Sequence, residues 1–140
     1  MKCKILLLAL AVGAVSCGGD AKTELFNGRD LTGWVCVTAG GPAAAEVFTV
    51  QYGCIRVAGQ PFGFLRTAEQ YGDYRLHAEW RWIGKPSNSG LFQRIQEGDE
   101  LWPSLIECQL ESGNAGDLLG LGGATMAGVE SPEGGVPVKK

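Results

Sequence analysis

Hydrophobic and polar positions alternate with a period of two along most of this chain. The clearest run is DYRLHAEWRWIG. Every second position in it is apolar or aromatic: Tyr74, Leu76, Ala78, Trp80 and Trp82. The positions between them are polar or charged: Arg75, His77, Glu79 and Arg81. Because successive side chains of a strand point to opposite faces, the run predicts a β-strand with one apolar and one polar face.

Shorter alternating runs continue this pattern on both sides. EVFTVQYGCIRV contains two runs around Gln51-Tyr52-Gly53, which predicts a hairpin, and FGFLRT, SGLFQRI and SLIECQL follow. No helical periodicity longer than two turns stands out. Short strands separated by Gly, Pro, Asn and Asp predict an all-β domain of the sandwich or jelly-roll type.

The stretch SLIECQLESGNAGD places polar side chains on one face of a strand. Ile106, Cys108 and Leu110 share the face expected to be buried, and the opposite face carries Glu107, Gln109 and Glu111. That polar face has two interpretations. It is either solvated or the floor of a binding site.

The first residues predict export. MKCKILLLALAVGAVSC has Lys2 and Lys4 followed by an apolar run, which is typical of a secretory signal and too short to span a bilayer. Residues 14–17 resemble a bacterial lipobox, so we expect Cys17 to be lipidated, residues 1–16 to be removed without taking part in the fold, and residues 17–23 to form the anchor and tether. The expected location is the bacterial cell envelope, periplasmic or anchored to the outer membrane, with membrane contact through the lipid only.

Charge and cysteine content exclude some classes of partner. Loss of Lys2 and Lys4 would change the formal charge from −3 to −5, which disfavours nucleic acid as a partner. Cys36, Cys54 and Cys108 remain, with no C-x-x-C spacing, so a zinc or iron–sulfur site has little support. A bridge between Cys36 and Cys54 and free thiols are both open.

Three longer stretches resemble one family of exported bacterial proteins, the 3-keto-disaccharide hydrolase domain family. They are ELFNGRDLTGW, FLRTAEQYGDYRLHAEWRW and NSGLFQRI…LWPSLIECQLESGNAGD, and the resemblance covers about residues 24–123. It implies a concanavalin-like β-sandwich over residues 24–140. Members of that family continue with further strands that are not found before VPVKK, so we expect a sandwich that is incomplete at its C-terminus.

The resemblance also implies hydrolysis of 3-keto-glycosides or 3-keto-disaccharides. A ketone at C3 acidifies the C2–H, and a base that removes this proton lets the enolate expel the oxygen on C1; water then adds to the double bond. Such a site needs a base, a stabiliser of the enolate and an acid. The residues proposed for these roles are Glu107 as the base, Arg81 and Arg94 at the enolate, Glu79 as the acid or as the partner of Arg81, and His77 as a proton shuttle.

Four further residues are candidates for substrate binding. Gln109 would hold a hydroxyl or the carbonyl, Arg94 is shared with the enolate role, Trp102 in the loop GDELWP would stack on a sugar ring, and Asn88 in PSNSG would bind a hydroxyl or form a turn. No cofactor and no cluster of metal ligands is indicated. A divalent ion would polarise a ketone well, so a metal stays compatible with the sequence.

The enzyme is one of three hypotheses that the sequence leaves open. The others are a carbohydrate-binding module without turnover and an inactive, truncated gene product. A glycosidase that uses Glu107 and Glu111 is disfavoured, because residues i and i+4 of a strand lie about 13 Å apart. That distance exceeds the roughly 5 to 9.5 Å between the carboxyl groups of such enzymes.

Overall fold

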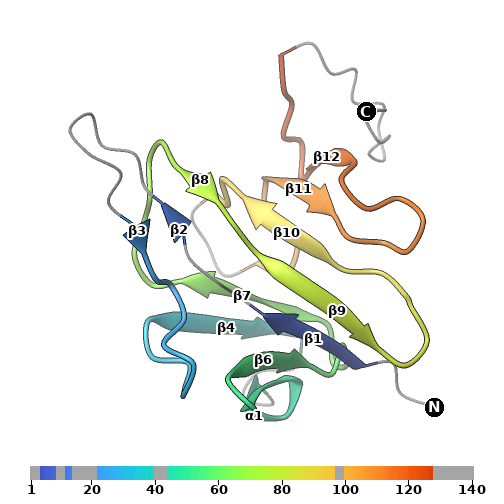
Figure 1. Ribbon diagram of the computed structural model, residues 1–140. Helices are drawn as coiled ribbons and strands as arrows, with labels where there is room; N and C mark the ends of the chain where they lie inside the picture. The colour runs from blue at the N-terminus through green and yellow to red at the C-terminus, as the bar shows by residue number, and fades with distance from the viewer. Residues whose placement is uncertain (1–3, 9–11, 14–21, 40–43, 97–99, 128–140) are drawn as a thin grey trace. The chain divides into compact units, whose positions relative to one another are not determined.

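The computed structural model describes residues 4–8, 12–13, 22–39, 44–96 and 100–127 (Figure 1). Within these residues the chain is all-β apart from the four-residue helix α1 (Ala44–Val47), and its strands pair antiparallel. The predicted all-β class is confirmed, and the architecture is consistent with a β-sandwich. The chain forms two compact units, Met1–Lys85 and Pro86–Lys140, each of which is described by itself.

The described residues of the first unit form three sheets. A four-stranded sheet has the order β5 (Phe48–Gln51), β6 (Cys54–Val57), β1 (Lys4–Leu8) and β9 (Glu79–Ile83). A three-stranded sheet has the order β3 (Lys22–Thr23), β2 (Val12–Gly13) and β8 (Arg75–Leu76). The third sheet pairs β4 (Trp34–Thr38) with β7 (Gly63–Thr67).

The hairpin predicted around residues 51–53 is confirmed. Gln51 at the end of β5 pairs with Cys54 at the start of β6. Tyr52 and Gly53 between them have φ of 53° and 71°, which makes this a two-residue turn with both central residues in the left-handed region, the geometry that suits the twist of a hairpin. Ile55 on β6 is fully buried at 0% exposure, whereas Tyr52 at the tip is fully exposed. The hairpin therefore anchors the apolar interior of the first unit.

The long alternating run at residues 74–83 forms two strands instead of one. β8 ends at Leu76, and β9 begins at Glu79, so His77 and Ala78 lie between them. Along β9 the predicted alternation holds, because Glu79 and Arg81 are exposed while Trp80 and Trp82 are partly buried. The two indoles contact each other edge to face, with ring centroids 5.6 Å apart.

The segment NGRDLTGW is a turn stabilised by its own side chains. Asn27 Oδ1 accepts hydrogen bonds from the backbone N–H groups of Arg29 and Asp30 at 2.8 and 3.0 Å. Asp30 Oδ1 accepts bonds from the Asn27 amide and from the Thr32 N–H, and these bonds lower the pKa of Asp30 to about 2. The polar residues of this motif therefore serve the turn.

The second unit contains a three-stranded antiparallel meander. Its strands are β10 (Gly90–Gln93), β11 (Leu105–Gln109) and β12 (Leu118–Leu121). Backbone bonds from Leu110 N–H to Ser89 and from Ser112 N–H to Ser87, 2.8 and 2.9 Å long, continue the contact beyond β10 and β11. β11 is thus the central strand of this sheet, with a neighbour on each side.

The apolar run near the N-terminus also forms a strand in the uncleaved chain. β1 lies between β6 and β9, with Leu6 in register with Arg56 on one side and Arg81 on the other. These pairings belong to the full chain, and the expectation that residues 1–16 take no part in the fold of the mature protein stays a prediction. Removal of these residues by a signal peptidase stays a prediction, and Cys17 lies outside the described residues.

A proline at position 6 tests the place of β1 in the sheet. Leu6→Pro removes a backbone donor from a strand with neighbours on both sides, so we expect it to destabilise the uncleaved chain by about 1–3 kcal/mol, as for an unsatisfied buried backbone group. Leu6→Val, which keeps the donor, is the control. Urea unfolding of the three uncleaved chains measures the difference, and equal stability of all three would show that the sheet does not need this segment.

Candidate functional site

Glu107 lies at the centre of β11 with a residue of each neighbouring strand beside it. It is in register with Phe92 on β10 and with Leu119 on β12. Directly opposite residues of antiparallel strands share a face, so these three side chains belong to one face of the sheet. The meander therefore places the carboxyl group between an aromatic and an aliphatic neighbour.

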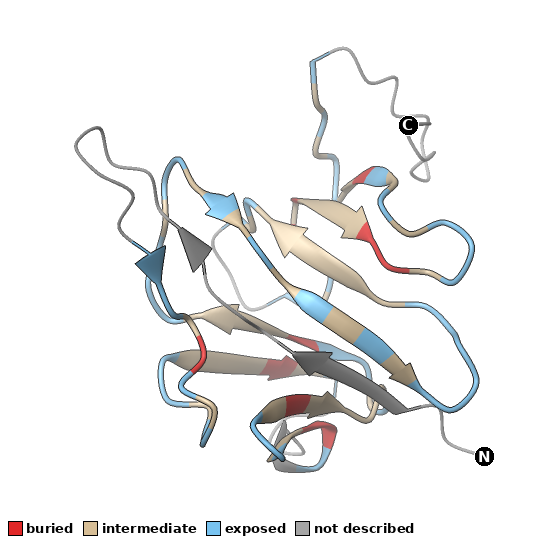
Figure 2. Cartoon of the chain, in the orientation of Figure 1, coloured by how far each residue is buried: buried red, intermediate tan, exposed pale blue. Residues whose placement is uncertain are grey.

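The face that carries Glu107 is the more buried one, contrary to expectation. Within β11, Leu105 and Gln109, which have the same parity as Glu107, are 1% and 8% exposed, whereas Ile106 and Cys108 of the opposite parity are only partly buried (Figure 2). Leu110, directly after the strand, is 4% exposed and is buried as expected. The alternation of Ile106 and Cys108 suggested the reverse assignment. Leu105 is apolar as well, so the sequence alone did not show which face of the strand is buried. The pairing of Glu107 with the buried Leu119 shows that it is the face of Leu105, Glu107 and Gln109.

Glu107 is a half-buried carboxyl group for which the described residues provide no compensating partner. Within the described part of the chain its side chain makes no hydrogen bond and no ion pair. Burial raises the pKa of Glu107 above the ordinary value of 4.5, because removal of water disfavours the charged form. A carboxylate in such an environment is a stronger base than an exposed one, and carboxyl groups with shifted pKa values are frequent at functional sites.

Gln109 has its carbonyl oxygen bound by the chain itself. Oε1 accepts hydrogen bonds from the backbone N–H groups of Leu110 and Glu111, both 2.9 Å long. Its predicted sugar contact can therefore come only from Nε2, for which the described residues provide no acceptor. Glu111 is engaged in the following turn, where its Oε2 accepts a 2.7 Å bond from the Asn114 amide.

Trp102 and Phe92 form an aromatic pair in the same unit. Their ring centroids are 6.4 Å apart with planes inclined at 59°. Trp102 is 57% exposed, and Phe92 is the residue directly opposite Glu107. Trp102 has the exposure that a stacking role would require, and Phe92 links this indole to the carboxyl group, a connection that sequence spacing did not reveal.

Arg94 and Asn88 flank the two ends of β10. Arg94 directly follows the strand and has a φ of 56°, an uncommon conformation for a residue with a Cβ. Its carbonyl accepts a 3.0 Å bond from Gln96 Nε2, and its side chain is exposed. Asn88 is exposed in the loop before β10, between two serines whose carbonyls bond to the chain beyond β11.

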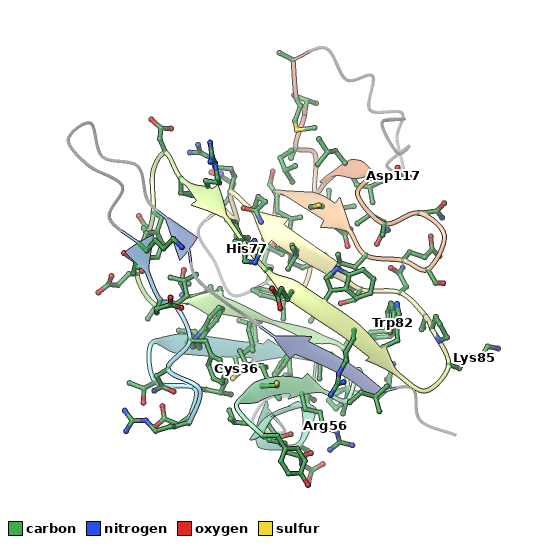
Figure 3. All side chains as sticks on the ribbon, viewed as in Figure 1. Cys36, Arg56, His77, Trp82, Lys85 and Asp117 are labelled. Atoms are coloured by element: carbon green, nitrogen blue, oxygen red, sulfur yellow. The ribbon has the colours of Figure 1, made fainter. Side chains whose placement is uncertain are left out.

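The remaining candidates belong to the first unit. His77 Nε2 lies 3.5 Å from Glu79 Oε1, and their side chains are 61% and 56% exposed. Arg81 is exposed at the next position of the same parity on β9. Figure 3 shows His77 at the junction of β8 and β9 and, in the second unit, Asp117 in the segment before β12. The two sets of candidates therefore belong to separate compact units.

The described residues form neither a metal-binding cluster nor a disulfide. No group of three or more His, Cys, Asp or Glu side chains there could hold a metal ion. Cys36, Cys54 and Cys108 are free thiols, which decides between the two alternatives left open for Cys36 and Cys54. Among the described residues, no helix has the length and apolar character to cross a membrane.

Comparison with known proteins identifies one family. Residues 21–136 match the family model of the 3-keto-alpha-glucoside-1,2-lyase-like domain. This match covers more than half of the chain and includes all the candidate catalytic and substrate-binding residues. No curated protein and no solved structure matches the chain.

The raised pKa of Glu107 makes a prediction about stability. A group whose pKa is higher in the folded state costs stability as the pH rises through and above 4.5, because the folded protein resists losing the proton. Glu107→Gln removes this cost, so we expect the variant to be more stable than the wild type at about pH 7 and equally stable at about pH 3.

Urea unfolding at the two pH values measures the difference. The control is Glu100→Gln, which changes an exposed carboxyl group of the same unit and is expected to have no such effect. If Glu107→Gln proved less stable than the wild type at both pH values, the carboxyl group would be stabilising the fold, and our interpretation of its burial would be wrong.

Proposed function

This chain belongs to the 3-keto-alpha-glucoside-1,2-lyase-like domain family, and from that premise we propose that it cleaves glycosides that carry a ketone at C3. The family supports action on glycosides in general. The finer proposal is that the reaction proceeds by proton abstraction at C2, elimination of the glycosidic oxygen from C1 and addition of water. With water addition the net reaction is hydrolysis of a 3-keto-glycoside or 3-keto-disaccharide.

The observation that carries this proposal is the environment of Glu107. Abstraction of a proton next to a ketone needs a base whose pKa is closer to neutral than that of an exposed carboxylate. Burial raises the pKa of Glu107 in this direction, and no partner in the described chain stabilises its charge, which supports Glu107 as the base. The exposed Trp102, in contact with Phe92 beside this carboxyl group, offers a surface on which a sugar ring can stack.

The proposed reaction has an elimination stage followed by the addition of water. Glu107 takes the C2 proton, and the electron pair of that bond forms the enolate with the C3 oxygen. The enolate then restores the C3 ketone while the C1–C2 double bond forms and the C1–O bond breaks, and the leaving oxygen takes a proton. The Glu107 carboxyl group exchanges its proton with solvent, water adds at C1, and C2 receives a proton from Glu107, which gives the 3-keto sugar and the free alcohol.

Other side chains are proposed for the charges that develop in these steps. An arginine suits the enolate oxygen because its charge is permanent, and Arg94 belongs to the same unit as Glu107. Arg81 is the second candidate for this role, with Glu79 and His77 as candidates for proton transfer to the leaving group. Asn88 and the Nε2 of Gln109 are proposed to bind sugar hydroxyls.

The setting of this reaction is also a proposal. Residues 1–16 would direct export, and lipidation of Cys17 would anchor the protein in the bacterial cell envelope. No cofactor is proposed. A divalent metal that polarises the ketone is compatible with the chemistry, and comparing turnover with and without a chelator would test for one.

One observation favours a second candidate function. An exposed indole packed against a second aromatic ring is a common surface for sugar binding without chemistry. A carbohydrate-binding module would use Trp102 and Phe92 in this way and would have no need of the carboxyl group. Turnover therefore separates the two functions.

The first test of the proposed function is turnover of a 3-keto-disaccharide, with the unoxidised disaccharide as control substrate. We expect Glu107→Gln to lower kcat/KM at least about 100-fold and Glu100→Gln to leave it unchanged. In D₂O the product should carry deuterium at C2, and the acidic limb of the pH profile should lie above pH 4.5, the ordinary pKa of a glutamate.

The assay separates the proposed enzyme from a binding module, and elimination from direct hydrolysis. Binding of the sugar without turnover by the wild type would support the binding module. Turnover without deuterium at C2 would contradict elimination, because direct hydrolysis at C1 leaves the C2–H bond intact.

The aromatic surface makes an independent prediction. Trp102→Ala is expected to raise KM about 10-fold, or about 1.4 kcal/mol, with a smaller change in kcat, since stacking acts on substrate and transition state alike. Trp102→Phe should retain most of the affinity. The matched control is Phe62→Ala, which removes another aromatic ring that is 57% exposed. An unchanged KM for Trp102→Ala would remove this residue from the site.

A further inference from the structure

Gly90, at the start of β10, is the residue whose absent side chain makes room for the carboxyl group of Glu107. Phe92 lies opposite Glu107, and Gly90 lies two positions earlier on β10, opposite Gln109. Diagonal neighbours of this kind lie within reach of a long side chain. A Cβ added at Gly90 would overlap Oε1, Cδ and Cγ of Glu107.

The backbone conformation does not account for this glycine. Gly90 is not among the residues with positive φ, so its conformation is open to any amino acid. A glycine inside a strand weakens the sheet and often marks a place where another group approaches closely. At Gly90 the approaching group is the Glu107 side chain, which accounts for a glycine at a position that would otherwise favour a β-branched residue.

Other crowded glycines of the chain differ in what they face. A Cβ at Gly63 would first meet the backbone carbonyl of Val37, and one at Gly122 would meet the backbone of Pro103 and Ser104. Those glycines allow two segments of backbone to approach. At Gly90 the atoms that would be displaced belong to an ionisable side chain, so the consequence of a substitution is chemical as well as structural.

From this geometry we propose that Gly90 is a positioning residue, which keeps the Glu107 carboxyl group against β10 and out of water. The inference deepens the proposed function and rests on it for the role of Glu107 as the base. A methyl group at position 90 would force Glu107 into another rotamer. Its carboxyl group would then move toward solvent, where the cause of its raised pKa is lost.

Gln109 limits the ways in which the site could adjust to such a change. Its Oε1 is held by two backbone N–H groups, and its side chain is 8% exposed, so it has little freedom to move. Gln109 lies directly opposite Gly90, and the atoms nearest to an added methyl group all belong to Glu107. The mobile partner is the carboxyl group.

The experiment is a titration of Glu107 by ¹³C NMR in the full chain, for the wild type, Gly90→Ala and Gly72→Ala. Gly72 is the control, because a Cβ there would meet nothing within 4 Å and its φ is not in the left-handed region. We expect the pKa of Glu107 to fall toward 4.5 in Gly90→Ala and to stay raised in Gly72→Ala. An unchanged pKa in Gly90→Ala would overturn the inference.

Kinetics give a second readout. If the protein turns over a 3-keto-disaccharide, Gly90→Ala should lower kcat about 100-fold, as for a base displaced by about 1 Å, with little change in KM. The acidic limb of its pH profile should move to lower pH. A pKa that falls in a protein without turnover would support the inference about Gly90 and overturn only the proposed function.

A double variant keeps the test decisive if Gly90→Ala does not fold. If the clash with the Glu107 side chain is the cause, Gly90→Ala combined with Glu107→Ala should fold, because the atoms that the new methyl group meets are gone. Failure of both variants to fold would show that Gly90 is needed for another reason, and would overturn the inference.

Discussion

Burial of a carboxyl group without a partner is costly, and Glu107 imposes this cost on the sheet formed by β10, β11 and β12. The neighbours of Glu107 in register are Phe92 and Leu119, which give its charge no compensation. The sheet retains the group because Leu105 and Leu119 bury their side chains on the same face, and because Gly90 leaves room beside it. Such a loss of stability at one position is typical of a functional site.

The sequence predicted the strands better than it predicted their faces. The hairpin at Tyr52 and Gly53 follows from local turn chemistry, and the polar and apolar faces of β9 follow from alternation, so both were accessible. The buried face of β11 was not, because Leu105 and Ile106 are apolar neighbours of opposite parity. Only pairing with β12 selects between them.

The candidate site was predictable in its residue types and not in its contacts. Glu107 and Trp102 stand out as a carboxylate on a strand and an indole in a loop, and Trp102 is exposed, whereas Glu107 lies on the more buried face of its strand. Phe92 and Gly90 carry no such signal. Their importance comes from the register of β10 against β11, which is a long-range property of the sheet. Gln109 is the opposite case. Its residue type suggested sugar binding, but its side-chain oxygen accepts hydrogen bonds from the backbone instead.

The N-terminal apolar run has a composition that suits two incompatible roles, the proposed export leader and a strand inside a sheet. A leader needs an unbroken apolar segment, and a strand with neighbours on both sides needs the same property. In the uncleaved chain, Lys4–Leu8 takes the strand position between β6 and β9. β6 and β9 both pair antiparallel with β1 and are therefore parallel to each other, so they can adjoin directly only with a different hydrogen-bond pattern. Loss of the leader would consequently leave each with an unpaired edge until another strand took that position.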